Sequence, residues 1–391
     1  MAHTFSAISS HPDTRTAAFE ISASLEKALK GLEAGAVVVF ASFHHGGNFD
    51  AITRILRDTL TPQALIGGTA RTVFTHHPTE SDRCGLSAFV LAGEAIEAKA
   101  CALDWSRGPA ELTTSAQWRS HLHTGSTHAG VFLLADPFSS APEPILNAMD
   151  GARLGPLGGG LLSGSTLPGG NLMVADDIVI NSGMVGIGFG GDISCASVMS
   201  NGCRPIGKPM VITEVRGDLI VTLGGRPAAE VARDSMLALA EKERARFVHG
   251  LRIGIVIDEY ATMHGQGDFL IRRVLGVDRR DGALQVDQRL SAGRTIQFQL
   301  VDQQTGANDL QLALDAQELG EDRILGGLIS VSTARSPMHS EIPALRDDRP
   351  DMAICGMTSI AEFGNADGVS RLQGGFNSTL VFKQNASQDS S

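Results

Sequence analysis

One arrangement of residues occurs three times along this chain of 391 residues and constrains its fold more than any other feature. Each copy has an apolar run, a polar loop, a helical stretch and a second apolar run that carries glycine. The first runs are 37–40, 131–134 and 328–329, and the glycine-bearing runs are 64–68, 158–160 and 352–356. A further strand-like run follows each copy, at 86–91, 185–189 and 378–382.

Each copy therefore predicts the order strand, helix, strand, returning strand, which is an α/β unit. We expect mixed β-sheets with flanking helices. Two explanations of the pattern stay open: true repetition of one unit, or coincidence between ordinary strand–helix–strand pieces.

The length of the chain predicts two domains, because a single core rarely serves so many residues. Residues 211–223 alternate apolar and polar side chains around a hairpin turn at 216–218, and a helix is expected after them. We place the boundary near residue 222, with domains at 1–222 and 223–384. The polar residues 385–391 predict a disordered tail.

Composition and charge bear on the partners and the location of the protein. The formal charge is −11 and aromatic residues make up 5% of the chain, which disfavours binding to nucleic acid. No apolar run is long enough for a membrane-spanning helix, and the N-terminus lacks the pattern of a secretion signal. Five scattered cysteines without a C-x-x-C pair are typical of a reducing compartment, so we expect a cytoplasmic protein.

Motifs for metal and cofactor chemistry are not found. The histidine pairs at 44–45, 76–77 and 121/123 lack the spacing of metal ligands, so no metal is predicted. Residues 186–191 match G-x-G-x-x-G, but the alternating run 193–198 that follows predicts a strand, where a dinucleotide site needs a helix. With no G-x-S-x-G or P-loop either, no catalytic residue is predicted.

Candidate ligand-binding residues lie in the loops after the first strand of each copy. In α/β sheets ligands bind at the carboxyl ends of strands, where helix N-termini offer free N–H groups. The candidates there are His44, His45, Asp136, Ser139 and Arg335, with Ser332 beside Arg335. Arg335 would hold a carboxylate through two hydrogen bonds. Alternatively, Asp136 and Ser139 only form a turn and cap a helix.

Two further candidates lie in the second half of the chain. The loop 202–207 presents Cys203 and Arg204 between glycines, either to a ligand or as a structural crossing between domains. Asp258, Glu259 and Asp268 form a carboxylate cluster. Such a cluster serves acid–base chemistry in an enzyme, holds a cation, contacts a ligand, or pairs with nearby arginines.

An ordered series of motifs resembles the FIST proteins over nearly the whole chain. These motifs are residues 11–14, 44–45, 135–139, 202–207, 223–228, 258–260, 267–272, 274–278 and 293–298. The resemblance implies a FIST N-like domain at 1–222 and a FIST C-like domain at 223–384. It also implies a sensory protein for a small metabolite, such as an amino acid or a small carboxylate, coupled to intracellular signalling through a protein partner.

The resemblance also implies an alternative, because one bacterial branch of similar layout carries haem and reports nitric oxide. No other cofactor is expected. Residues 330–336 stand where relatives have Cys-Asn-Gly-Arg-Gly, and residues 361–364 stand where they have Gly-Glu-Ile-Gly. We therefore expect a changed ligand, or a site that is partly lost.

Overall fold

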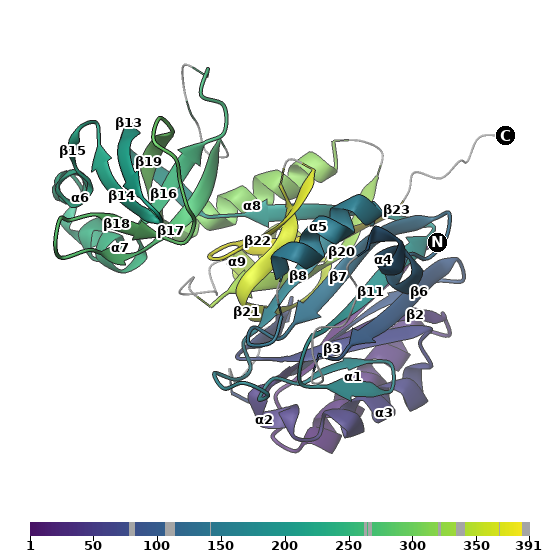
Figure 1. Ribbon diagram of the computed structural model, residues 1–391. Helices are drawn as coiled ribbons and strands as arrows, with labels where there is room; N and C mark the ends of the chain where they lie inside the picture. Colours follow the sequence, from purple (N-terminus) through teal and green to yellow (C-terminus); the bar gives the residue numbers. More distant parts are fainter. Residues whose placement is uncertain are drawn as a thin grey trace. The chain divides into compact units, whose positions relative to one another are not determined.

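The computed structural model describes residues 1–77, 83–105, 114–140, 142–261, 264, 268–319, 322–333, 341–366 and 368–384. The chain forms two compact units (Figure 1). Unit 1 comprises Met1–Ser200 and Leu310–Ser391, and unit 2 comprises Asn201–Asp309. Residue 222 lies inside unit 2.

Unit 1 consists of three copies of one α/β repeat. Repeat 1 contains β1 (His3–Ser9), α1 (Thr14–Leu29), β2 (Ala34–Ser42), α2 (Phe43–Gly46), α3 (Phe49–Leu60), β3 (Ala64–Ala70), β4 (Val73–Thr75) and β5 (Leu86–Ala92). Repeat 2 contains β6 (Ile96–Leu103), α4 (Ser115–Leu122), β7 (His128–Ala135), α5 (Pro142–Ala152), β8 (Leu157–Leu162), β9 (Met173–Ala175), β10 (Ile178–Ile180) and β11 (Met184–Gly191). Repeat 3 contains β12 (Ile193–Ser200), α8 (Gln303–Gln317, which begins within unit 2), β20 (Arg323–Ser332), α9 (Glu341–Asp348), β21 (Ala353–Ala366), β22 (Val369–Gln373) and β23 (Asn377–Gln384).

The pairing of the strands is the same in each repeat. The two strands around the second helix are parallel: β2 with β3, β7 with β8, and β20 with β21. The returning strand is antiparallel to the first of them: β5 with β2, β11 with β7, and β23 with β20. A further outer strand pairs with each returning strand: β1 with β5, β6 with β11, and β12 with β23. The predicted α/β class and the predicted repeat are confirmed. Each repeat also has a strand and a helix that precede the elements predicted from the sequence.

The hairpin region after each glycine-bearing strand pairs with the preceding repeat. β4 of repeat 1 pairs with β21, β9 of repeat 2 pairs with β3, and the second half of β21 pairs with β8. Strand β12 after β11 is consistent with the rejection of the G-x-G-x-x-G match. The three repeats thus form a closed ring in which each extends the sheet of another.

The central core of unit 1 lies inside this ring. Phe89, Phe189 and Phe382 come from the returning strands of the three repeats, and all three are buried. The ring centroid of Phe382 lies 5.3 Å from that of Phe89 and 4.9 Å from that of Phe189. The aromatic contacts therefore join all three repeats in one apolar cluster.

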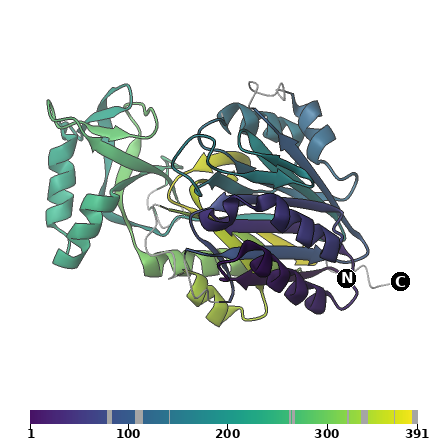
Figure 2. The same cartoon turned by 90° about the horizontal axis from the view of Figure 1, so that it is seen from below.

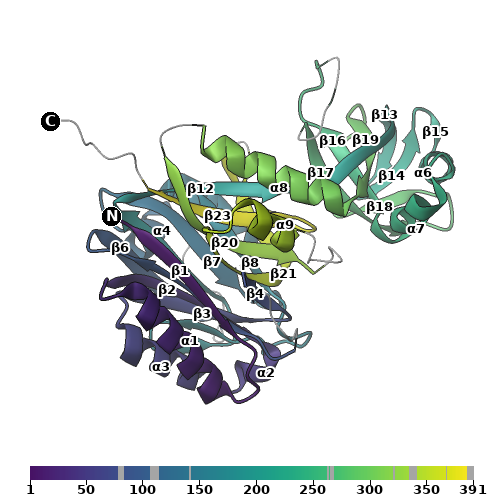
Figure 3. The same ribbon diagram turned by 180° about the vertical axis from the view of Figure 1, so that it is seen from behind.

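Helices cover the outer faces of the sheets. Helices α1 and α3 pack side by side over the strands of repeat 1, as the purple helices in Figure 2 show. In α3, Ile52, Leu56 and Leu60 recur at helical spacing and are buried. Helices α8 and α9 cover the strands of repeat 3 (Figure 3). No helix in the described ranges is long and apolar enough to cross a membrane.

Unit 2 is a small antiparallel barrel with two helices. Its elements are β13 (Cys203–Arg216), β14 (Leu219–Leu223), β15 (Arg226–Pro227), α6 (Ala228–Leu237), α7 (Glu241–Gly250), β16 (Arg252–Val256), β17 (Phe269–Val277), β18 (Leu284–Val286) and β19 (Thr295–Val301). The strand order is β13-β19-β16-β17-β18-β14, and β14 pairs again with β13 to close the barrel. The predicted turn at 216–218 joins β13 to β14.

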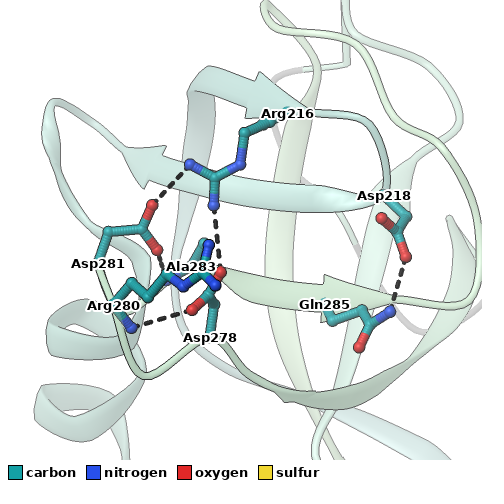
Figure 4. Close-up of polar contacts among 7 residues, drawn as sticks. All are labelled: Arg216, Asp218, Asp278, Arg280, Asp281, Ala283 and Gln285. Atoms are coloured by element: carbon teal, nitrogen blue, oxygen red, sulfur yellow. Dashed lines mark hydrogen bonds and ion pairs between the residues drawn. The ribbon is translucent and has the colours of Figure 1, made fainter.

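Polar contacts connect the turn at 216–218 to β18 and to the loop between β17 and β18 (Figure 4). Arg216 forms ion pairs with Asp281 at 2.8 Å and Asp278 at 3.3 Å. Gln285 donates a hydrogen bond to Asp218 at 2.8 Å. Because these ion pairs are partly exposed to solvent, they position the two turns more than they stabilise the barrel.

Replacing Phe382 by alanine tests the central cluster. The variant loses a buried ring that contacts two other repeats, so we expect the free energy of unfolding to fall by about 3–5 kcal/mol. Urea unfolding measures this change. Phe19→Ala is the matched control, because Phe19 is 58% exposed and should change stability by no more than about 0.5 kcal/mol. Equal stabilities of the two variants would contradict the role of the cluster.

Candidate functional site

Ser139 belongs to a clasp that recurs in all three repeats. After the first parallel strand, a serine hydroxyl accepts a hydrogen bond from a glycine N–H that lies just before the returning strand. The pairs are Ser42–Gly85 at 3.0 Å, Ser139–Gly183 at 2.8 Å and Ser332–Gly375 at 3.2 Å. A contact common to all three repeats indicates a structural role, since the loops differ in their other side chains.

Asp136 is buried and fully engaged within repeat 2. Its Oδ2 accepts hydrogen bonds from the Phe138 N–H, the Ser139 N–H and the Ser139 hydroxyl. Its Oδ1 accepts a hydrogen bond at 3.2 Å from Asn171, which is also buried. These bonds shape the turn and hold the hairpin of repeat 2 against it, and the ligand-binding role of Asp136 and Ser139 stays a prediction.

The two histidines of the first loop have different surroundings. His44 is exposed, and its Nε2 lies 2.7 Å from the carbonyl oxygen of Pro12. His45 is fully buried, and its Nδ1 lies 3.0 Å from the Thr14 hydroxyl, while its Nε2 is buried with no hydrogen-bond partner among the described residues. Burial, with the neighbouring charge of His44, lowers the pKa of His45 to about 4.

Repeat 3 buries two carboxylates at the corresponding end of its sheet. Glu362 accepts hydrogen bonds from the Ser359 hydroxyl at 2.7 Å and the Phe376 N–H at 3.1 Å. Glu341 accepts one from Asn377 at 3.0 Å. Arg335, predicted to hold a carboxylate nearby, lies outside the described residues.

Glu362 lies at the junction of repeats 2 and 3. It pairs with Gly160 of β8 and is buried.

The candidates of unit 2 are engaged in local contacts. Cys203 is buried, and its N–H donates a hydrogen bond to Asn201 at 2.7 Å. Arg204 forms an ion pair with Glu243 of α7. Asp268 is exposed, and its backbone carbonyl accepts a hydrogen bond from Ile257.

The predicted carboxylate cluster includes one well-defined ion pair. Glu259 lies 3.0 Å from Arg294 and accepts a hydrogen bond from the Thr295 N–H. Burial pushes the pKa of Glu259 up, but the Thr295 hydrogen bonds and the Arg294 charge outweigh it and hold the pKa below its ordinary value. Asp258 accepts a hydrogen bond from the Tyr260 N–H within a turn. These contacts suit the structural alternative, and the enzyme hypothesis stays a prediction.

A cavity of about 460 Å³ lies at the junction of repeats 2 and 3. Its volume is within the range of small-molecule sites. The end of α5 and the connection to β8 supply one wall, and β12 and the β21–β22 hairpin supply the other. The lining residues are Val131, Met149, Asp150, Arg153, Leu154, Gly155, Pro156, Leu157, Ser197, Asn365, Gly368 and Ser370.

The cavity combines one cationic and one anionic side chain on the same helix end. Asp150 accepts a hydrogen bond from the Ser370 N–H through Oδ1, which leaves Oδ2 as a further acceptor. Arg153 follows just past the end of α5 at Ala152, and it is exposed. The cavity is therefore suited to a small molecule with an anionic group for Arg153 and a hydrogen-bond donor for Asp150.

A haem does not fit the lining of this cavity. Haem iron takes an axial side chain, most often histidine, and the ring needs a large apolar surface. No histidine is among the described lining residues, and Asp150, Arg153, Asn365 and Ser370 make the walls polar. Across the described ranges, no group of three or more His, Cys, Asp or Glu side chains is arranged to hold a metal ion.

Comparison with known proteins identifies the family. The model of the FIST N domain matches residues 35–226, and that of the FIST C domain matches residues 228–365. The chain belongs to the FIST family. It is 30% identical over 384 residues to the uncharacterized protein Rv0628c of Mycobacterium tuberculosis, with 96% of this chain and 98% of the relative covered. It is 32% identical over 306 residues to the uncharacterized protein Mb0898c of Mycobacterium bovis, with 78% and 77% covered.

The cavity of this FIST protein involves residues that the sequence reasoning missed. Asp150 and Arg153 are three residues apart in the sequence, and Gly155-Pro156 follows them as a signal that a helix ends nearby. This signal was available in the sequence. Asn365 and Ser370 come from a hairpin over 200 residues later, and nothing local connects them to α5.

Replacing Ser139 by alanine tests the clasp. The change leaves the Gly183 N–H unpaired, so we expect the free energy of unfolding to fall by about 1–3 kcal/mol. Ser42→Ala should cost a similar amount, since it breaks the same contact in repeat 1. Ser24→Ala, on the exposed face of α1, is the control in urea unfolding. A Ser139→Ala protein as stable as this control would show that the clasp is dispensable.

Burial of His45 predicts a loss of stability in mild acid. The pKa is about 4 in the folded protein against 6.5 for an ordinary histidine, so the unfolded chain binds the proton first. The free energy of unfolding is therefore not reduced by His45 above pH 6.5. As the pH falls from 6.5 toward 4, protonation of His45 in the unfolded chain lowers it by at most about 3 kcal/mol.

Unfolding by urea at pH 7.5, 6, 5 and 4 measures this dependence. His45→Gln should reduce the slope without abolishing it, because glutamine does not titrate but burial also lowers the pKa of His76 to about 4. His44→Gln removes the exposed neighbour and should leave most of the slope. The prediction fails if His45→Gln and the natural protein lose stability in parallel.

Proposed function

We propose that this FIST protein is a sensory protein that binds a small polar metabolite in the cavity between repeats 2 and 3. FIST domains are known as sensory domains, and both domain models match this chain. The observation that carries the proposal is the cavity of about 460 Å³ with Asp150 and Arg153 on its walls.

The charges of the lining define the ligand class. A carboxylate bound by the Arg153 guanidinium forms charge-assisted hydrogen bonds, and an amine or hydroxyl group suits the free acceptor of Asp150. Amino acids and small hydroxy-carboxylates carry both groups. The apolar side chains of Val131, Met149 and Leu157 would contact the rest of such a molecule.

The proposal includes a cytoplasmic location and a signalling partner that responds to the ligand. All five cysteines are free thiols in the structure, which supports a reducing compartment. Binding would favour one conformation of the protein, and the partner would recognise that conformation.

A thermal-shift panel of glycine, L-serine, L-glutamate, lactate, succinate and uracil tests the ligand class. We expect at least one amino acid or hydroxy-carboxylate at about 10 mM to raise the melting temperature, because ligands that bind only the folded state stabilise it. Arg153→Ala should weaken that binding about tenfold or more, since a hydrogen bond to a charged group contributes roughly 1.5–3 kcal/mol.

Arg54→Ala is the matched control, because Arg54 is an exposed arginine on α3. No stabilisation by any compound would contradict the proposed ligand class. Binding that is equally strong in Arg153→Ala would place the ligand elsewhere in the protein.

A further inference from the structure

Strand β12 lines the cavity and leads directly into unit 2. Ser197 is one of the lining residues, β12 ends at Ser200, and unit 2 begins at Asn201. The equivalent strand of repeat 1, β1, is followed by only residues 10–13 before its helix. The third repeat therefore carries unit 2 as an insertion between its leading strand and its leading helix.

The hydroxyl of Ser197 connects three strands. It donates a hydrogen bond to the Leu157 carbonyl of β8 at 2.6 Å and accepts one from the Asn365 N–H of β21 at 3.0 Å. Asn365 also accepts a hydrogen bond from the Leu157 N–H at 2.5 Å. A displacement of β8 or β21 thus acts on β12 through one side chain.

The same network reaches the charged wall of the cavity. Asn365 donates a hydrogen bond to the Ser370 hydroxyl at 3.3 Å, and the Ser370 N–H donates one to Asp150 at 3.0 Å. Asp150, Ser370, Asn365 and Ser197 therefore form a continuous chain of contacts from α5 to β12. A ligand on Asp150 or Ser370 would contact this chain directly.

Close packing couples β12 to its neighbours along its length. A Cβ atom on Gly130 of β7 would lie 2.9 Å from the Cβ of Cys195, and one on Gly364 of β21 would lie 2.5 Å from the sulfur of Met199. The side chains of Cys195 and Met199, two residues before and after Ser197, therefore pack against glycines of two neighbouring strands. Packing this tight transmits a shift instead of absorbing it.

The segment that receives the shift is ordered by contacts within unit 2. The Gly202 N–H donates a hydrogen bond to Asp309 at 3.1 Å, and the Asp302 N–H donates one to the Gly202 carbonyl at 2.9 Å. Hydrogen bonds thus connect the first residues of unit 2 to its last residues. A displacement of the backbone at Ser200 would therefore act on both ends of the insertion.

We propose that occupancy of the cavity is transmitted to unit 2 through β12, with Ser197 as the positioning residue. Unit 2 is then the part of the protein that responds to the ligand. This inference rests on the proposed function, because the cavity must be the binding site for the response to have a biological input.

A covalently attached occupant tests the transmission without knowledge of the natural ligand. Ser370→Cys places a thiol in the cavity wall, and N-ethylmaleimide converts it to a fixed occupant, with labelling verified by intact mass. The natural protein treated in the same way controls for its own five cysteines. Hydrogen–deuterium exchange of the full chain then compares labelled and unlabelled Ser370→Cys.

We expect labelling to change the exchange rates of amides in residues 198–206 by about threefold or more, because local opening equilibria respond to small changes in packing. Exchange in β1, the equivalent strand of repeat 1, should not change. In Ser197→Ala/Ser370→Cys the label should still change exchange around Ser370, but its effect on residues 198–206 should fall below half.

Two results would overturn the inference. One is complete labelling that alters exchange in α5 and β22 but leaves residues 198–206 as they were. The other is an undiminished response in the double variant, which would exclude Ser197 from the path. Both are independent of the metabolite panel, so failure to find a natural ligand is distinguishable from failure of the transmission.

Discussion

The pairing of each repeat with the sheet of the preceding one is the constraint on which the rest of unit 1 depends. A glycine-bearing strand at the edge of an isolated repeat would leave its backbone groups unpaired. β9 covers that edge in repeat 1, the second half of β21 covers it in repeat 2, and β4 covers it in repeat 3. Because the exchange is cyclic, no repeat is complete alone, and the apolar cluster around Phe382 forms only when all three are present.

This near-symmetry separates structural residues from candidate functional ones. The serine–glycine clasp recurs in every repeat, so Ser139 follows from the architecture and needs no ligand to explain it. Features that occur in a single repeat carry more information about function. The buried His45 and the cavity beside Arg153 are such features, and the cavity has the volume of a small-molecule site.

The insertion of unit 2 explains why the sequence domains and the compact units differ. The FIST N match ends at residue 226 and the FIST C match begins at 228, close to the boundary predicted near 222. The compact units instead divide the chain at 200/201 and 309/310. Repeat 3 begins with β12 and resumes in α8. Its strands therefore come from segments that precede and follow the barrel in the sequence. A sequence domain boundary is therefore not a boundary of the folded unit in this family member.

The sequence by itself determined the features that depend on neighbouring residues. Strand and helix periodicity predicted the three copies, the turn at 216–218 and the strand after residue 191, because these patterns arise within a few residues. Motifs in a fixed order indicated the FIST family. The same reasoning predicted a ligand at the carboxyl ends of the strands, where Asp136 and Ser139 are engaged in local hydrogen bonds.

Only the tertiary structure decided the ring, the barrel and the cavity. Asp150, Ser197, Asn365 and Ser370 meet because α5 packs on β22 while β12 lies beside β8 and β21, and no periodicity in the sequence connects residues so far apart. The physical reason is that local patterns record which face of an element is buried, while long-range backbone pairing decides what it is buried against.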